Sequence, residues 1–125
     1  MSKVRLLLMV AILGSAMLIA GACTIGNMSV SELMEDPVYD TEIKIEGTVS
    51  LLGELWCPCF ELTSNGETVT VWYGLMVEDD GTEKPSVSVE GIENGDYVVV
   101  TGELKSGGTH HSLNDFWASS IEKID

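Results

Sequence analysis

The sequence predicts an all-β protein: a small closed barrel of five strands, with a short helix before it and an apolar signal or anchor helix at the N-terminus. Three observations predict this class. From residue 41 onward apolar and polar residues alternate in short segments, glycines interrupt two of these segments, and turn-forming pairs such as Asn-Gly separate them. At 125 residues the chain has room for one domain.

The first 23 residues have the pattern of an export signal. Lys3 and Arg5 precede an uncharged apolar run, LLLMVAILGSAMLIAGA, at residues 6–22. The run has 17 residues, near the lower limit for a spanning helix of about 20. An uncleaved anchor is therefore the alternative to a cleaved or lipidated signal.

Cys23 ends this stretch in the segment LIAGAC. The segment resembles a bacterial-type lipobox at Gly21, Ala22 and Cys23, and differs from it at Ala20, where leucine is usual. The resemblance implies that Cys23 becomes a lipid-bearing N-terminus; otherwise it is a small apolar residue in an ordinary signal or anchor. In each case we expect the remaining chain to be extracytoplasmic, either anchored to the outer face of the cell membrane or secreted.

The segment after Cys23 is strongly acidic. It contains all 20 acidic residues and four lysines, so its net charge is near −16. A surface of this charge repels phosphate backbones and anionic headgroups, which argues against nucleic acid as a partner. The charges are spread along the chain, as in a solvated acidic surface rather than an acidic tail.

A tether and a short helix are predicted at residues 24–40, between the signal or anchor at 1–23 and the barrel domain at 41–125. The helix is expected within 29–37, capped by Ser29 or Ser31 and ended by proline. Its inward side chains are expected to be Val30, Leu33 and Met34.

Alternating residues predict the strands of the barrel. The segments are 41–52, two strands within 59–73 joined across Asn65-Gly66, 97–105 and 116–124. The acidic segment 74–96 is predicted to be a long connection, with one short extended piece at 87–89.

Two segments share an apolar-x-Gly-x-apolar pattern, IKIEGTV around Gly47 and VVVTGEL around Gly102. A glycine inside a long strand allows the strand to bend and pair with two neighbours. Together with GIENGDYVVVTGELK, these segments resemble the OB-fold family, in particular its small exported or tRNA-anti-like modules, over residues 41–124. The resemblance implies a five-stranded OB-like barrel in which two loops frame a ligand-binding face.

Those two loops hold the residues with the most distinctive chemistry. Cys57 and Cys59 lie in ELWCPCFEL, and His110 and His111, the only histidines, lie in SGGTHHSLND. If the resemblance holds, the four side chains meet at the barrel mouth and could bind zinc or copper. The alternatives are a disulfide, either structural or redox-active, two inert thiols, and histidines in an ordinary polar loop.

Trp72 and Thr70 are predicted to face outward on the same face, where a tryptophan could stack on a planar ligand or a sugar. The alternative is that the N-terminal helix covers Trp72, or that the strand register differs by one residue.

The function expected from these features is that of a non-enzymatic binding module at a membrane surface. Its partners would be the membrane, through the N-terminal lipid or anchor, and a metal ion, another small ligand or a protein. The alternatives are single-stranded nucleic-acid binding, common among OB-folds, and thiol redox chemistry at Cys57 and Cys59.

Overall fold

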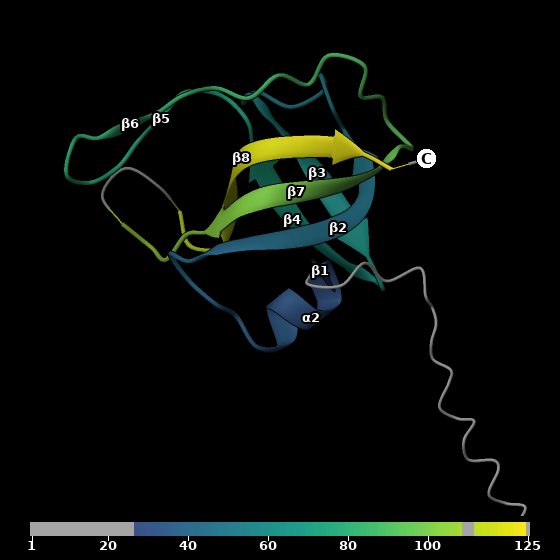
Figure 1. The fold of residues 1–125 in the computed structure, drawn as a ribbon, viewed down its shortest axis with the longest axis horizontal. Coiled ribbons are helices and arrows are strands. Elements are labelled where there is room, and N and C mark those ends of the chain that lie inside the picture. Colours follow the sequence, from purple (N-terminus) through teal and green to yellow (C-terminus); the bar gives the residue numbers. More distant parts are fainter. Residues whose placement is uncertain (1–26, 109–111, 125) are drawn as a thin grey trace, which may run out of the picture.

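The structure is a computed structural model that describes residues 27–108 and 112–124 (Figure 1). It is mostly β with one short helix, as the sequence predicts. The elements are β1 (Asn27–Ser29), α2 (Val30–Glu35), β2 (Glu42–Ser50), β3 (Cys59–Ser64), β4 (Glu67–Trp72), β5 (Met76–Val77), β6 (Glu83–Lys84), β7 (Tyr97–Leu104) and β8 (Asp115–Lys123).

Five strands form a closed ring. The hydrogen-bonded order is β2-β3-β4-β8-β7, and β7 pairs again with β2. Strands β4 and β8 run parallel, while the other four pairs of the ring are antiparallel. Outside the ring, β1 runs parallel to β2, and β5 and β6 form a separate two-stranded hairpin.

Gly47 marks the point at which β2 changes partner. Residues 42–48 of β2 pair with β7, whereas Thr48, Val49 and Ser50 pair with β3. A Cβ atom at Gly47 would lie 2.7 Å from the backbone oxygen of Thr63, so the crossing excludes a side chain there. Gly102 of β7 is equally constrained, because a Cβ atom would overlap the backbone oxygen of Trp117. As predicted for the two strands with an internal glycine, β2 pairs with both β3 and β7, and β7 pairs with both β2 and β8.

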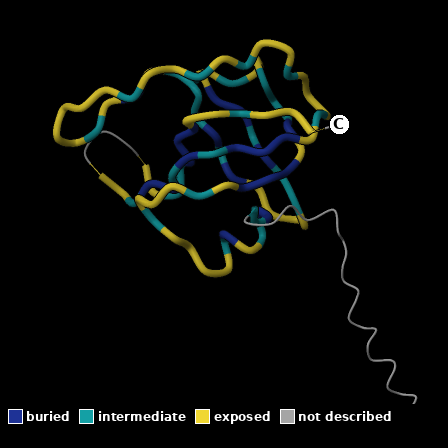
Figure 2. Tube along the Cα trace, in the orientation of Figure 1, coloured by how far each residue is buried: buried dark blue, intermediate teal, exposed yellow. Residues whose placement is uncertain are grey.

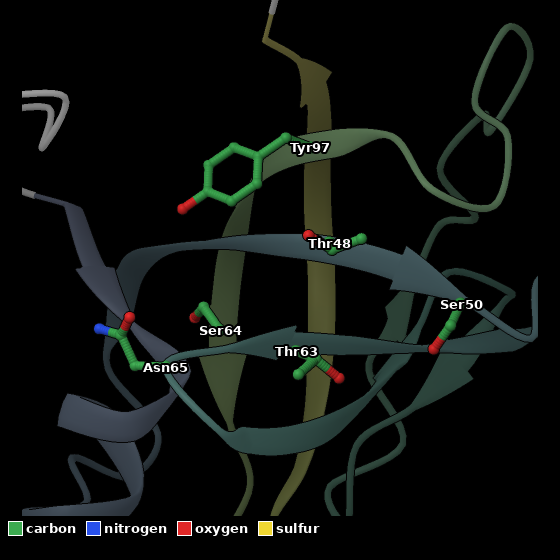
Figure 3. Close-up of a pocket in the computed structure, with 6 residues that line it drawn as sticks. All are labelled: Thr48, Ser50, Thr63, Ser64, Asn65 and Tyr97. Atoms are coloured by element: carbon green, nitrogen blue, oxygen red, sulfur yellow. The ribbon is translucent and has the colours of Figure 1, made fainter.

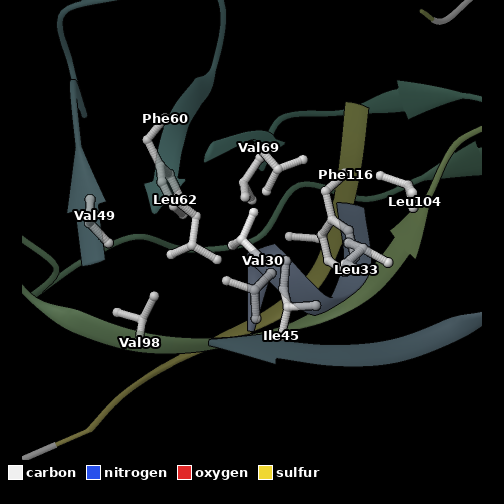
Figure 4. Close-up of a cluster of buried hydrophobic side chains, with 13 residues drawn as sticks. Val30, Leu33, Ile45, Val49, Phe60, Leu62, Val69, Val98, Leu104 and Phe116 are labelled. Carbon is white, nitrogen blue, oxygen red and sulfur yellow. The ribbon is translucent and has the colours of Figure 1, made fainter. Parts of the chain in front are cut away.

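The core fills the ring (Figures 2 and 4). In Figure 4 its apolar side chains point toward one another from the strands and from α2. The buried members are Val30, Leu33, Ile45, Val49, Phe60, Leu62, Val69, Val71, Val98, Val100, Leu104, Phe116 and Ala118. Burial of this apolar surface provides the main driving force for folding.

Helix α2 contributes to this core from below the ring in Figure 1. Ser29 is its N-cap: the hydroxyl accepts a hydrogen bond from the Glu32 N–H, and the Glu32 carboxylate accepts one from the Ser29 N–H. Of the two predicted caps, Ser29 is therefore the correct one. Ser64 of β3 fixes the helix to the ring, because its hydroxyl accepts a hydrogen bond of 2.7 Å from the Val30 N–H.

The hairpin between β3 and β4 turns at the predicted Asn65-Gly66 pair. Both residues have positive φ, 51° and 87°, which suits a tight two-residue turn. At alternate positions of the two strands, Phe60, Leu62, Val69 and Val71 are buried. Tyr73 is half-buried and stacks on Phe60 with ring centroids 6.1 Å apart.

Two local predictions were wrong. Residues 27 and 28 were predicted to belong to a tether, but together with Ser29 they form β1, because β2 offers them backbone partners from Lys44 to Glu46. No strand forms at 87–89, although the Val87 N–H donates to the backbone oxygen of Tyr73; the extended pieces are β5 and β6.

No helix among the described residues is long and apolar enough to cross a membrane. The predicted signal or anchor at 1–23, with Cys23, lies outside the described residues.

Candidate functional site

Two of the candidate residues, Cys59 and Trp72, lie with Trp117 in one row across neighbouring strands. Cys59 of β3 pairs with Trp72 of β4, which pairs with Trp117 at the start of β8. Neighbouring strands lie about 4.8 Å apart, so Cys59 and Trp117 are roughly 10 Å apart across the sheet. The end of the loop at residues 51–58 and the start of β8 therefore lie at the same end of the ring. That the cysteines meet His110 and His111 there stays a prediction.

Cys57 and Cys59 are joined by a disulfide, with their Cα atoms 5.2 Å apart. Pro58 bends the chain between them, and the Tyr73 N–H donates to its carbonyl oxygen at 2.9 Å. The two sulfurs differ in access, because Cys57 is half-buried whereas Cys59 is 1% exposed. Trp56, just before the pair, is fully exposed.

Trp72 has an unusual environment. The residue is half-buried, and its indole N–H is buried without a hydrogen-bond acceptor among the described residues. A buried donor without an acceptor typically costs about 1–3 kcal/mol, so native proteins seldom retain one without a reason. Thr70, two residues earlier on β4, is half-buried and pairs with Glu61 and Asp115.

Lys105 forms a charged cluster that the sequence did not reveal. It is 4% exposed, and its ammonium lies 3.0 Å from a Glu78 oxygen, 3.3 Å from Asp40 and 3.4 Å from Glu103. The same ammonium lies over the Trp117 ring, 4.7 Å from its centre. These contacts join the segment before β2, the β5–β6 region and the end of β7.

Burial favours the neutral form of Lys105, but hydrogen bonds to Glu78, Asp40 and Glu103 outweigh it and raise the pKa of the ammonium. The pKa of Asp40 is lowered, chiefly by the hydrogen bond that its carboxylate accepts from the Ser106 hydroxyl, and also by Lys105. Both groups are thus held in their charged forms.

A second feature that the sequence did not single out is a pocket of about 440 Å³ on the outside of the ring (Figure 3). Every residue that lines it is uncharged. The lining residues are Thr48 and Ser50 of β2, Thr63 and Ser64 of β3, Asn65 of the turn and Tyr97 of β7. Hydroxyl groups at alternate strand positions gave no signal, because outward-facing Ser and Thr are ordinary in strands.

The predicted metal site depends on residues that the structure covers only in part. His110 and His111 lie outside the described residues. Within residues 27–108 and 112–124, no group of three or more His, Cys, Asp and Glu side chains is arranged to hold a metal ion. In the disulfide form the sulfurs of Cys57 and Cys59 are not thiolates, which are the form that binds zinc and copper(I).

Comparisons with known proteins find similarity among solved structures. No protein-family model matches the chain, and no curated protein matches it. Among solved structures, the hypothetical protein ygiW from E. coli matches with a TM-score of 0.49 and 13% identity, over 82% of this chain and 99% of that one.

Proposed function

We propose that this chain is an exported, membrane-associated binding module built on an OB-like barrel. Its pairing order supports the barrel, since β2 lies between β3 and β7 and the parallel β4–β8 pair closes the ring, as in a five-stranded Greek-key barrel. The N-terminal segment and Cys23 would hold the module at the outer face of the membrane.

The ligand site of this proposal is the row formed by Cys59, Trp72 and Trp117, together with the exposed Trp56 and Cys57. The Trp72 indole N–H carries the proposal, because it is buried without an acceptor among the described residues and a ligand could supply one. The ligand would be a small molecule with an acceptor atom and a flat face, or a metal ion held by Cys57, Cys59, His110 and His111. If the ligand is a metal ion, the two cysteines must be reduced, and the ion would be zinc or copper(I).

The test uses the full chain in detergent, prepared both oxidised and reduced under anaerobic conditions. Zinc and copper(I) are titrated in turn and bound metal is measured. One equivalent bound by the reduced form only, and lost in Cys57→Ser and in His110→Ala, supports the metal site. The matched control Cys23→Ser should retain the metal, because Cys23 is not a proposed ligand.

Absence of metal binding in the reduced form overturns the metal site. The organic-ligand form is tested by two-dimensional NMR, in which the Trp72 indole N–H resonance is followed during titration with free tryptophan, indole and adenosine as flat probes. A downfield shift of that resonance supports the site, and no shift with any probe contradicts it. Tight, salt-sensitive binding of a single-stranded oligonucleotide would favour the nucleic-acid alternative instead.

A second candidate function is thiol-disulfide exchange, favoured by the unequal access of the two sulfurs. A partner's thiolate would attack the accessible Cys57 sulfur, the bond to Cys59 would break, and Cys59 would leave as a thiolate that takes up a proton. The partner's second thiol then resolves the mixed disulfide. The net result is transfer of two electrons from the partner dithiol to the Cys57–Cys59 disulfide.

This candidate is tested with two single-cysteine variants. Cys59→Ser leaves the accessible thiol of Cys57, which should attack a cysteine peptide activated as its disulfide with thionitrobenzoate, forming a mixed disulfide with the peptide and releasing thionitrobenzoate. Cys57→Ser leaves the buried Cys59 and should form little of this mixed disulfide. Equal trapping by the two variants, or trapping by neither, would contradict the candidate.

A further inference from the structure

We infer that the uncharged pocket across β2 and β3 is a binding site for a neutral saccharide. It is distinct from the Cys59–Trp72–Trp117 row, and the inference does not depend on the function proposed for that row. The pocket volume, about 440 Å³, lies within the range of roughly 300–1,000 Å³ usual for small-molecule sites.

The pocket is a product of the way β2 changes partner. Thr48 and Thr63 form the residue pair at one end of the β2–β3 ladder. On the N-terminal side of Thr48, residues 42–47 of β2 pair with β7 and have no partner in β3. Where β2 and β3 separate, the Ser64 hydroxyl donates to the backbone oxygen of Glu46 at 2.7 Å and so bridges the two strands. The Asn65 turn and Tyr97 flank this opening from two sides (Figure 3).

Several polar groups in the pocket are not used by the fold. The side chains of Thr48, Ser50 and Asn65 make no hydrogen bond to any residue in 27–108 or 112–124. The Thr63 hydroxyl is paired with that of Thr68 at 2.8 Å and still has capacity for another bond. Two hydroxyls and one amide are thus available, and together they can donate and accept.

Tyr97 supplies an aromatic wall whose orientation is fixed. Its hydroxyl donates to a Glu46 carboxylate oxygen at 3.2 Å, and the Asn27 amide donates to the other oxygen of the same carboxylate at 3.1 Å. The Tyr97 residue remains 39% exposed, so part of its ring can contact a ligand. A tyrosine ring offers an apolar face next to polar groups, the combination that suits the C–H face of a sugar ring.

Charge selects among ligand classes. No lining residue is charged, so the pocket offers no counter-ion to a phosphate or a carboxylate. The chain also carries a formal charge of −14, which repels anionic ligands at long range. Hydroxyl-rich neutral molecules match the available donors and acceptors, and among them a cyclic saccharide also matches the tyrosine wall.

The test is saturation-transfer NMR on the full chain in detergent, with the methyl glycosides of glucose, galactose, mannose and N-acetylglucosamine as probes. Methyl glucuronide, which is anionic, serves as the charged control. At least one neutral glycoside should bind, with a Kd in the millimolar range or below, and methyl glucuronide should bind at least tenfold more weakly. No binding by any neutral probe, or equal binding by the charged control, overturns the inference.

Substitutions in the pocket test whether the saccharide binds there. Thr48→Val removes a hydroxyl without changing side-chain shape, and Asn65→Gly removes the amide while keeping a residue that accepts positive φ. Each should weaken binding at least threefold and both together at least tenfold, with the fold checked by circular dichroism. Thr101→Val, on β7 outside the pocket, should leave the Kd unchanged. Binding that survives the double substitution, or that Thr101→Val weakens equally, would contradict the assignment.

Discussion

The ammonium of Lys105 lies over the ring of Trp117, 4.7 Å from its centre, and both residues are almost fully buried. Lys105 follows β7 directly and Trp117 belongs to β8, so the contact ties the ends of two adjacent strands. Three carboxylates surround the same ammonium, which makes this the most highly charged buried contact among the described residues.

Replacing Lys105 should destabilise the protein. Lys105→Met keeps an apolar stem over Trp117 but leaves three carboxylates without their cation. We expect a loss of about 2 kcal/mol in the free energy of unfolding, measured by urea denaturation. Lys123→Met is the matched control, because Lys123 is half exposed and lies 3.5 Å from Asp96, and it should cost less than about 0.5 kcal/mol.

The contribution of Lys105 should also depend on pH. Its pKa in the folded protein is raised above 10.5, so its stabilising effect is fully present below pH 10.5 and is lost as the pH rises through the folded-state value. The difference in unfolding free energy between the parent chain and Lys105→Met should therefore be constant from about pH 7 to about pH 10 and shrink above that. A difference that grows above pH 10.5 would contradict the raised pKa.

Gly102 should not tolerate a side chain. In Gly102→Ala the new Cβ atom would overlap the backbone oxygen of Trp117 and lie 2.9 Å from the Phe116 ring, so β7 and β8 would have to separate. We expect a loss of about 3 kcal/mol in unfolding free energy. Gly107→Ala is the control, since its Cβ atom would meet only Leu113, at 3.8 Å. Similar thermal midpoints for the two variants would contradict this prediction, because they would show that β7 and β8 accommodate the added methyl group without loss of stability.

The helix cap offers a direct comparison between two serines. Ser29→Ala removes the hydroxyl that accepts from Glu32 N–H and should cost about 1 kcal/mol. Ser31→Ala, inside the helix, should be neutral or slightly stabilising because alanine favours the helix. Equal effects in chemical denaturation would mean that the cap contributes nothing to folding.

The two paired tryptophans should respond differently to phenylalanine. Trp117→Phe removes part of the surface on which Lys105 rests and should cost about 1–2 kcal/mol. Trp72→Phe removes an indole N–H that is buried without an acceptor among the described residues, which offsets part of the lost packing, so we expect a smaller loss. Thermal unfolding without ligand measures the loss of stability in each variant. A larger loss for Trp72→Phe than for Trp117→Phe would indicate that the Trp72 indole N–H has an acceptor.

Features encoded in local sequence were predictable. The Asn65-Gly66 turn, the glycines of β2 and β7 and the capped helix each follow from the conformational needs of a few neighbouring residues. Strand β1 was not predictable, because its three residues have no alternating pattern and depend on β2 for their hydrogen bonds.

The candidate site was predicted less completely, because it also depends on contacts between segments that are distant in the sequence. The sequence drew attention to Cys57, Cys59 and Trp72 through their residue types, and the structure brings Cys59 and Trp72 together as a strand pair. The Lys105 cluster joins carboxylates from positions 40, 78 and 103, which no linear pattern connects. The pocket arises where β2 leaves β3, a property of pairing rather than of any one segment.

The closed ring has a consequence for the protein at high concentration. Each of its five long strands has a hydrogen-bonded neighbour on both sides over part of its length, so none of them has one edge that is unpaired from end to end. Exposed edges are where sheets of different molecules join and aggregate. A ring without a long unpaired edge allows many copies of the protein to lie close together without forming β-sheets between molecules.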